Sequence, residues 1–428
     1  MIRIEQLQFS QLPNFAFKQN NSILSSDSEI IDALKNNNYL SGSYSIISPQ
    51  RDGSVLLCRD PIGSRKLFYT FDSCTRKLYV SSNFIMLGQR LSFDKIRSVP
   101  AGGYIIIQST QDIRRYNVDH QNFGSEFKLG SVSDRLKDTF NYVSKCFNRK
   151  GLICLSGGLD STVVAYLAKS YFPDLKAVCT VFVDDLDFDA FSICGKLTPN
   201  KYHDFDRARR IAKSLGIALE PIVIRKSEML LNLQEVLLAC QDWRDFNVHC
   251  ATLNFFTARY ISNNIHLRDR VILTGDFMNE IFADYTSEFL NGEEFYKQPV
   301  ISKSARQRFL IRGLESSDRE LGVFSYFGLT CVQPYITTIE IYKELRKDIL
   351  ELENAKYEIN GTLLPDPLLN LVGQSKVRAQ TGDETGGILG HYVRNGFTQD
   401  NLRVEFVNCF DCPREFLNDF IIAGRYKT

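Results

Sequence analysis

The stretch "LICLSGGLDSTVV" at residues 152–164 decides the fold of this chain. Four apolar residues at 152–155 are typical of a buried strand, and the apolar residues that follow from Val163 to Ala168 have helical spacing. Two glycines, two serines and a carboxylate separate the two patterns. A strand that passes through a glycine-rich turn into a helix is the repeating unit of a parallel α/β sheet.

The turn itself has the residue types of an anion site. Gly157 and Gly158 allow a tight turn and a close approach of the backbone to a ligand. The N–H groups that follow belong to a helix N-terminus, and Ser156 and Ser161 add hydroxyl donors. Asp160 would repel a phosphate by itself, so its presence favours Mg²⁺ as a bridge to the phosphate oxygens. The stretch is not a Walker A loop, because no Lys-Ser/Thr pair follows the second glycine.

The segments around this turn alternate between strand and helix patterns, which predicts an α/β fold with a doubly wound parallel sheet. The chain from about residue 300 onward is predicted to be mainly helical. The predicted strands are 177–184, 218–224 and 270–276, and the predicted helices are 136–147, with Ser133 as N-cap, and 204–216, ended by Gly216.

Residues 1–120 have a different pattern, with short strands separated by turns, which predicts an antiparallel β-rich domain. A polar stretch at 121–133 is a candidate boundary, so we expect one domain at 1–125 and a second at 126–428. The predicted strands are 41–48, 54–60, 66–72, 77–82 and 102–107.

Composition excludes several classes of protein. The net charge of +1 gives no basic surface for nucleic acid or anionic membranes, and no apolar run is long enough to span a bilayer. Eleven scattered cysteines and a start without a signal-peptide pattern favour a cytoplasmic location. The pair Cys409 and Cys412 stands alone, and the five histidines are widely spaced, so a zinc site is not expected.

The motif SGGLDS resembles the pyrophosphate-loop signature of the ATP pyrophosphatase superfamily, and other stretches are similar to the asparagine synthetase and β-lactam synthetase family. TGDFMNEIFADY (274–285) resembles a family segment without a gap, and VQPYITTIEIYKEL (332–345) resembles another. Lys356 and Lys376 match two family lysines in spacing and order. The run 376–387 is especially similar to the β-lactam synthetase segment that begins with its catalytic lysine.

The N-terminal region is similar to the glutaminase domain of asparagine synthetase, an Ntn-hydrolase, in degenerate form. The similar stretches are 59–69, 78–83 and 99–104. The family nucleophile is an N-terminal cysteine, whereas the first cysteine of this chain is Cys58, inside a predicted strand. Glutamine hydrolysis is therefore not expected, as in the β-lactam synthetases.

The resemblance implies ATP and Mg²⁺ as cofactors and two half-reactions: a carboxylate is adenylated with release of pyrophosphate, and an amine then attacks the acyl-adenylate. Asp276 stands where the family has its amine-activating residue, and Lys376 and Lys356 would stabilise developing negative charge. Asn279 replaces a metal-ligating aspartate, with Glu280 beside it as a substitute. The implied ATP-binding residues are Leu155, Ser156, Gly157, Gly158, Asp160, Ser161, Val183, Thr274 and Gly275, and the implied metal ligands are Asp160, Asn279 and Glu280.

The leading hypothesis is a glutamine-independent, AMP-forming amide ligase of specialised metabolism, which would join a small-molecule or peptide carboxylate to an amine. The alternatives are a synthetase that uses free or partner-supplied ammonia, a nucleobase-modifying enzyme, which the neutral charge disfavours, and a non-catalytic scaffold relative. No nucleic acid or membrane partner is expected, and a homodimer stays open. Asn247, His249 and Tyr285 are candidate substrate-pocket residues.

Overall fold

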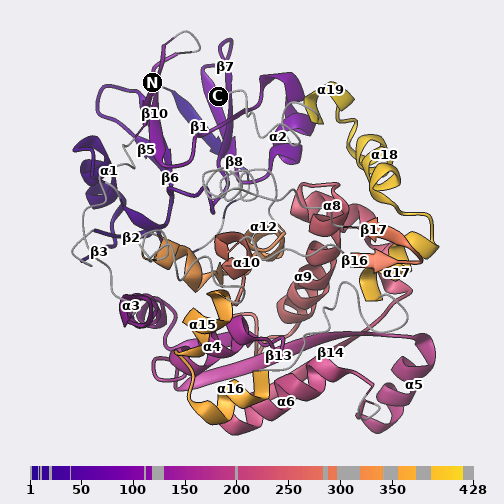
Figure 1. Ribbon diagram of the computed structural model, residues 1–428. Coiled ribbons are helices and arrows are strands. Elements are labelled where there is room, and N and C mark those ends of the chain that lie inside the picture. Colours follow the sequence, from indigo (N-terminus) through magenta and orange to yellow (C-terminus); the bar gives the residue numbers. More distant parts are fainter. Residues whose placement is uncertain are drawn as a thin grey trace.

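The structure is a computed structural model, in which the chain forms a β-rich N-terminal unit and an α/β unit (Figure 1). We call residues 2–117 the N-terminal unit and residues 130–417 the α/β unit. The residues that the structure describes are 2–7, 9, 12–18, 22–38, 40–109, 112–117, 130–197, 201–282, 288–295, 319–339, 341, 355–372 and 387–417. The predicted boundary at 125/126 lies outside them, so the division into domains stays a prediction.

Two four-stranded sheets and one three-stranded sheet make up the N-terminal unit. The first sheet has the order β1 (Arg3–Gln6), β8 (Lys77–Ser81), β7 (Phe68–Asp72) and β9 (Arg97–Ser98). The second has the order β11 (Ile113–Asn117), β10 (Gly103–Ile107), β6 (Val55–Arg59) and β5 (Ser45–Pro49), and the third has the order β3 (Ile23–Leu24), β2 (Phe15–Phe17) and β4 (Ser41–Ser43). The unit also contains α1 (Asp27–Lys35), α2 (Phe84–Arg90) and the short helix η1 (Phe93–Lys95).

Strand β6 explains how this unit is layered. Its side chains alternate between two buried clusters: Val55 and Leu57 pack toward β7 and β8, whereas Leu56 and Cys58 pack toward α1. Because successive side chains of a strand point to opposite faces, an apolar run on β6 lies between two layers at once. The predicted β-rich character is confirmed. The expectation of a purely antiparallel unit is wrong, since β1 pairs with β8 in parallel. No short turn connects these two strands, so nothing in the local chain forces an antiparallel direction.

The α/β unit is built on a parallel sheet of five strands, which confirms the predicted fold class. The order is β14 (Ala218–Arg225), β13 (Asp174–Val183), β12 (Lys150–Cys154), β15 (Val271–Leu273) and β18 (Cys331–Val332). Helices cover both faces: α6 (His203–Leu215) lies on one side of β13 and β14, and α9 (Asp245–Asn263) lies on the other (Figure 1). Across the second face, Thr180 of β13 hydrogen-bonds Thr257 of α9 at 2.6 Å.

Several helices complete the unit. Those that follow β12 and β14 are α4 (Leu159–Ala168), α7 (Glu228–Leu231) and α8 (Leu233–Cys240), and α5 (Asp185–Cys194) follows β13. The described part of the chain after residue 300 is mainly helical, as predicted. The remaining elements of the α/β unit are α10 (Met278–Phe282), β16 (Glu288–Leu290), β17 (Glu293–Phe295), α12 (Leu321–Tyr326), η2 (Pro334–Thr338), α15 (Ala355–Gly361), α16 (Asp366–Val372), α17 (Gly387–Arg394), α18 (Gln399–Phe410) and α19 (Arg414–Leu417).

Helix boundaries agree with the sequence at one predicted helix and differ at another. Gly216 is the left-handed C-cap of α6, as expected. Helix α3 (Gly130–Cys146) begins before Ser133, so the prediction of Ser133 as N-cap is wrong. The reason is Val132, which is fully buried and adds one more apolar position to the stripe of Leu136, Phe140 and Val143.

Helix α3 also joins the two units through a buried arginine. The Arg135 Nη1 donates to Ser41 Oγ of β4 at 2.7 Å and to the Thr337 carbonyl of η2 at 2.9 Å. Its guanidinium lies 4.4 Å from the centre of the Phe17 ring of β2. A buried charge with these partners fixes the angle at which β2, β4 and η2 meet.

All eleven cysteines are free in the structure. Within the described residues, the structure contains no helix with the length and apolar character needed to cross a membrane.

Arg135→Met is expected to lower the free energy of unfolding by about 2–4 kcal/mol, because two buried acceptors lose a charged donor and the ring contact is weakened. Chemical denaturation followed by circular dichroism measures the change. Lys137→Met, at a partly exposed position of the same helix, is the matched control and should change stability by less than about 0.5 kcal/mol. Equal stability of the two variants would contradict the role assigned to Arg135.

Candidate active site

The turn between β12 and α4 forms a polar cradle at the carboxyl edge of the sheet. The Ser156 and Ser161 hydroxyls lie 3.1 Å apart, and the Gly158 N–H donates to Ser156 Oγ at 3.4 Å. Helix α4 begins after Gly158, which supplies no side-chain cap. The N–H groups of the first turn of α4 therefore face the turn with the partial positive charge that suits a phosphate.

Two glycines allow this turn to pack as tightly as it does. Gly157 has φ of +73°, and a Cβ there would lie 2.9 Å from the Asp204 carbonyl oxygen of α6. A Cβ on Gly275 would lie 2.5 Å from the Ser161 amide nitrogen. The chain leaves β15 after Leu273, and Gly275 then lies directly against the first turn of α4. Only glycine fits at these two close backbone contacts. The contact at Gly275 brings Asp276 beside the cradle.

A lysine from a distant helix connects two of the predicted metal ligands. The Lys356 ammonium of α15 donates to Asp160 Oδ2 at 3.0 Å and to Asn279 Oδ1 at 2.8 Å. Asn360, one turn later on α15, donates to the other oxygen of Asp160 at 3.4 Å. The Tyr335 hydroxyl of η2 donates to the Asp160 backbone carbonyl at 3.1 Å. Two elements, α15 and η2, therefore hold Asp160 in one orientation.

The donor set fits a magnesium ion that arrives with a nucleotide. Asp160 and Asn279 each direct an oxygen at the same ammonium, so both can face one cation, and Mg²⁺ prefers one or two protein oxygens plus phosphate oxygens. Glu280 does not complete this pair: it is 5% exposed and makes an ion pair with Arg319. Within the described residues, no group of three or more His, Cys, Asp or Glu side chains could hold a metal ion.

Asp276 lies half-buried in an acidic neighbourhood. The pKa of Glu320 is raised to about 8: burial is the largest cause, Arg319 opposes it, and the negative charges of Asp276 and Glu280 add to the rise. Burial also raises the pKa of the Cys154 thiol, again with a contribution from Asp276. The carboxylates of Asp276, Glu280 and Glu320 are thus close enough to influence one another, with Arg319 as the nearby cation.

The other predicted residues have varied positions. Leu155 is buried, and its N–H donates to the Val178 carbonyl at 2.9 Å. The Val183 carbonyl, at the end of β13, accepts from the Lys226 N–H at 2.9 Å. Among the residues that the structure describes, the buried Thr274 hydroxyl has no hydrogen-bond partner, and the Thr274 N–H donates to the Val332 carbonyl. Lys376 and Tyr285 lie outside the described residues.

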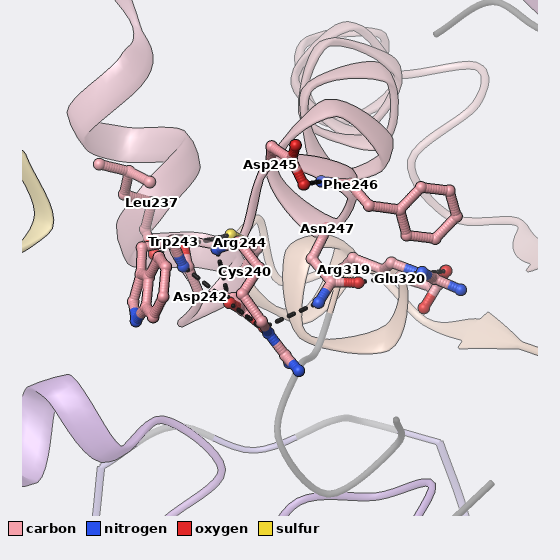
Figure 2. Close-up of polar contacts among 10 residues, drawn as sticks. All are labelled: Leu237, Cys240, Asp242, Trp243, Arg244, Asp245, Phe246, Asn247, Arg319 and Glu320. Atoms are coloured by element: carbon pink, nitrogen blue, oxygen red, sulfur yellow. Dashed lines mark hydrogen bonds and ion pairs between the residues drawn. The ribbon is translucent and has the colours of Figure 1, made fainter. Parts of the chain in front are cut away.

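Of the candidate pocket residues, His249 is a core residue. It is fully buried, and its ring stacks on Tyr392 with centroids 5.1 Å apart. Asn247 is also buried but belongs to a polar network with Asp242 and Arg319 (Figure 2). The residues that the sequence did not suggest are Asn360, Tyr335 and Arg319. Tyr335 lies inside the family-like stretch 332–345, which is the one signal that could have found it.

The fold and this loop define a class of α/β proteins with a polar, glycine-containing turn at the carboxyl edge of the sheet, and comparison with known proteins is more specific. Residues 148–325 match the family model Asparagine synthase. Asparagine synthetase [glutamine-hydrolyzing] 1 of Bacillus subtilis (strain 168) is 25% identical over 292 residues, which cover 62% of this chain and 42% of the relative. Residues 148–325 of this chain are therefore similar to the asparagine synthase domain. The chain spans about two fifths of the length of this relative.

Solved structures give weaker likenesses. The NMN synthetase from Francisella tularensis has a TM-score of 0.27 and 16% identity, over 59% of this chain and 99% of that one. The glutamine-dependent NAD+ synthetase from Acinetobacter baumannii, in complex with ADP, has a TM-score of 0.30 and 11% identity, over 77% of this chain and 52% of that one. At these TM-scores the likenesses carry no argument.

The burial of His249 leads to a prediction about acid stability. Burial lowers the pKa of His249 to about 3, whereas the unfolded chain takes up a proton near the ordinary value of 6.5. Between these two values the unfolded state binds more protons, so stability is present above pH 6.5 and falls as the pH falls, by at most about 1.4 kcal/mol per pH unit from this residue.

His249→Phe is therefore expected to flatten the loss of stability between pH 6.5 and pH 4, relative to its own value at pH 7. Denaturant midpoints across this pH range measure the effect. His266→Ala, at an exposed position, is the control and should keep the wild-type slope. A His249→Phe variant with the wild-type slope would show that another group causes the acid dependence.

Proposed function

We propose that this protein is an ATP-dependent amide-bond ligase that forms AMP and pyrophosphate and does not use glutamine. The observation that carries the proposal is the convergence of three features at one edge of the sheet. They are the uncapped first turn of α4, the Lys356 ammonium on Asp160 and Asn279, and Asp276 beside Gly275. The asparagine synthase domain spans the first and third of these features.

In the first half-reaction, a substrate carboxylate attacks the α-phosphorus of ATP and pyrophosphate leaves. The N–H groups from Gly158 onward and the hydroxyls of Ser156 and Ser161 would bind the phosphate oxygens. The Lys356 ammonium would also interact with the oxygens of the departing pyrophosphate and stabilise their negative charge. Asp160 and the Asn279 amide oxygen would hold Mg²⁺, which supplies further positive charge to those oxygens when it is bound.

In the second half-reaction, an amine attacks the acyl-adenylate and AMP leaves. The amine must lose a proton, and Asp276 is the carboxylate that we assign to accept it. Its half-buried position near Glu320 and Glu280 supports this role, because neighbouring negative charges make a carboxylate a better proton acceptor. We assign Lys376 to the developing oxyanion on the basis of its position in the sequence.

Independence from glutamine is supported by the state of Cys58, the first cysteine of the sequence. Burial raises the pKa of the Cys58 thiol, which is fully enclosed between β5, β10 and α1. A thiol in this environment stays protonated and cannot serve as a nucleophile. We therefore propose a free amine, or ammonia, as the nitrogen donor. A β-lactam-synthetase-like ligase of specialised metabolism fits this reading.

A non-catalytic relative is the second candidate, and one observation favours it. Asn279 is uncharged, and Lys356 already neutralises Asp160, so the site offers a cation little negative charge. Carboxylate-dependent exchange of pyrophosphate into ATP, across a panel of acids, separates the two. Exchange with any acid identifies a ligase, whereas nucleotide binding without exchange identifies the scaffold.

Asp160→Asn is expected to lower acid-dependent exchange by about 100-fold or more, because a carboxylate that orients Lys356 and Mg²⁺ becomes neutral. The exchange assay measures the rate, and thermal melting checks that the variant folds. Asp400→Asn, on the exposed face of α18, makes the same change from a carboxylate to an amide. This matched control should keep the wild-type exchange rate. A folded Asp160→Asn variant with undiminished exchange is the result that the proposal does not allow.

Asp276→Asn should separate the two half-reactions. We expect acid-dependent exchange to stay within about threefold of wild type, while amide product formed with the accepted amine falls by about 100-fold, the usual size of a general-base contribution. Mass spectrometry of the product measures the second step. If both steps fall together, Asp276 acts in binding and the base must be sought elsewhere.

A further inference from the structure

A sharp corner between α8 and α9 lies against the N-terminal unit. Gln241 has φ of +55°, in the left-handed region, and its N–H closes α8 on the Leu237 carbonyl at 2.9 Å. A residue other than glycine keeps this conformation only where its surroundings hold it in place. Gln241 is 4% exposed, so it is packed on all sides.

The side chain of Gln241 is held by the N-terminal unit. Its Oε1 accepts from the Phe84 N–H at 2.7 Å, and its Nε2 donates to the Ser82 carbonyl at 2.9 Å. Asn83, the N-cap of α2, donates to the Leu238 carbonyl at 3.0 Å. The start of α2 and the end of α8 therefore form one hydrogen-bonded joint.

The residue after this joint is the anchor of a polar network. Asp242 is fully buried and accepts from the Trp243 N–H at 2.8 Å, the Arg244 N–H at 2.9 Å and the Asn247 side-chain amide at 2.9 Å (Figure 2). The Arg244 guanidinium adds hydrogen bonds to both carboxylate oxygens, with Nη2 at 2.5 Å from Oδ2. A buried carboxylate with this many donors has one orientation.

The network continues from Asn247 to the candidate active site. Asn247 Oδ1 accepts from Arg319 Nη1 at 3.0 Å. Arg319 pairs in turn with Glu280 and, through Nε at 2.5 Å, with Glu320, and its guanidinium lies over the Phe246 ring (Figure 2). Glu280 follows Asn279 directly on α10. Arg319 thereby connects the corner to α10, the helix that begins after Asp276 and carries Asn279.

We propose that Gln241 and Asn247 are positioning residues, which couple the placement of the N-terminal unit to the loop of Asp276 and Asn279. The inference rests on the proposed function. It assigns a task to a unit whose Cys58 is unsuited to hydrolysis: through Ser82 and Phe84 it orients the corner, and the corner orients Arg319 and Glu280. The coupling is reciprocal, so a ligand at the turn 156–161 changes the corner in return.

The corner contains its own reporter. Trp243 is the single tryptophan of the chain, it is 4% exposed, and it packs under the Arg403 guanidinium at 5.3 Å. Its backbone N–H donates to Asp242 Oδ1. Gly275 lies against the first turn of α4. A nucleotide bound at that turn would therefore lie next to the loop that Arg319 and Glu280 position. Nucleotide binding is therefore expected to change the emission of Trp243.

The experiment measures ATP binding with Mg²⁺ by calorimetry and Trp243 emission in the same samples. For the wild type we expect binding with a change in emission. Gln241→Ala and Asn247→Ala should bind ATP within about threefold of wild type and lose most of the emission change. Arg319→Lys, which keeps the charge but not the planar fork, should behave in the same way if an alanine variant does not fold. Gln234→Ala, on the outer side of α8, is the matched control and should respond like wild type.

The outcomes separate the coupling from the proposed function. Wild-type binding without an emission change, folded variants that keep the full change, or loss of binding in step with loss of folding would each overturn the coupling alone. Failure of the folded wild type to bind ATP would overturn the proposed function, and the coupling with it.

Discussion

The ammonium of Lys356, held between Asp160 and Asn279, is the interaction on which the arrangement of the site depends. It brings together the first turns of α4 and α10 and helix α15, which lie far apart in the sequence. A half-buried cation between a carboxylate and an amide oxygen defines one point in space for three helices. Each helix can reach that point because the strands before α4 and α10 are neighbours in the sheet, so their carboxyl ends meet.

Two packing constraints make that meeting close enough for chemistry. Gly157 permits contact between the turn and α6, and Gly275 permits contact between the loop after β15 and α4. With a side chain at Gly275, Asp276 would move away from Asp160, and the separation of cradle and carboxylate would grow. The candidate site is therefore a consequence of backbone approach as much as of charged side chains.

The N-terminal unit takes part in this arrangement from two sides. Arg135 joins β2 and β4 to η2, whose Tyr335 holds the Asp160 backbone. On the other side, Gln241 joins α2 to the network that ends at Glu280. Both joints consist of buried polar groups with several partners, and such groups specify one geometry because any other leaves them unsatisfied.

The sequence by itself determined the parallel α/β sheet, the strand–turn–helix at 152–164, the C-cap Gly216 and the β-rich start, because these follow from local periodicity and glycine chemistry. It did not reveal that α3 begins before Ser133, since that depends on a pocket for Val132, nor that β1 runs parallel to β8. It suggested Glu280 as a metal ligand, whereas the structure pairs Glu280 with Arg319. Only the tertiary structure decides such pairings, because a charged side chain selects its partner by distance in space, and residues 39 positions apart have no periodic signal that connects them.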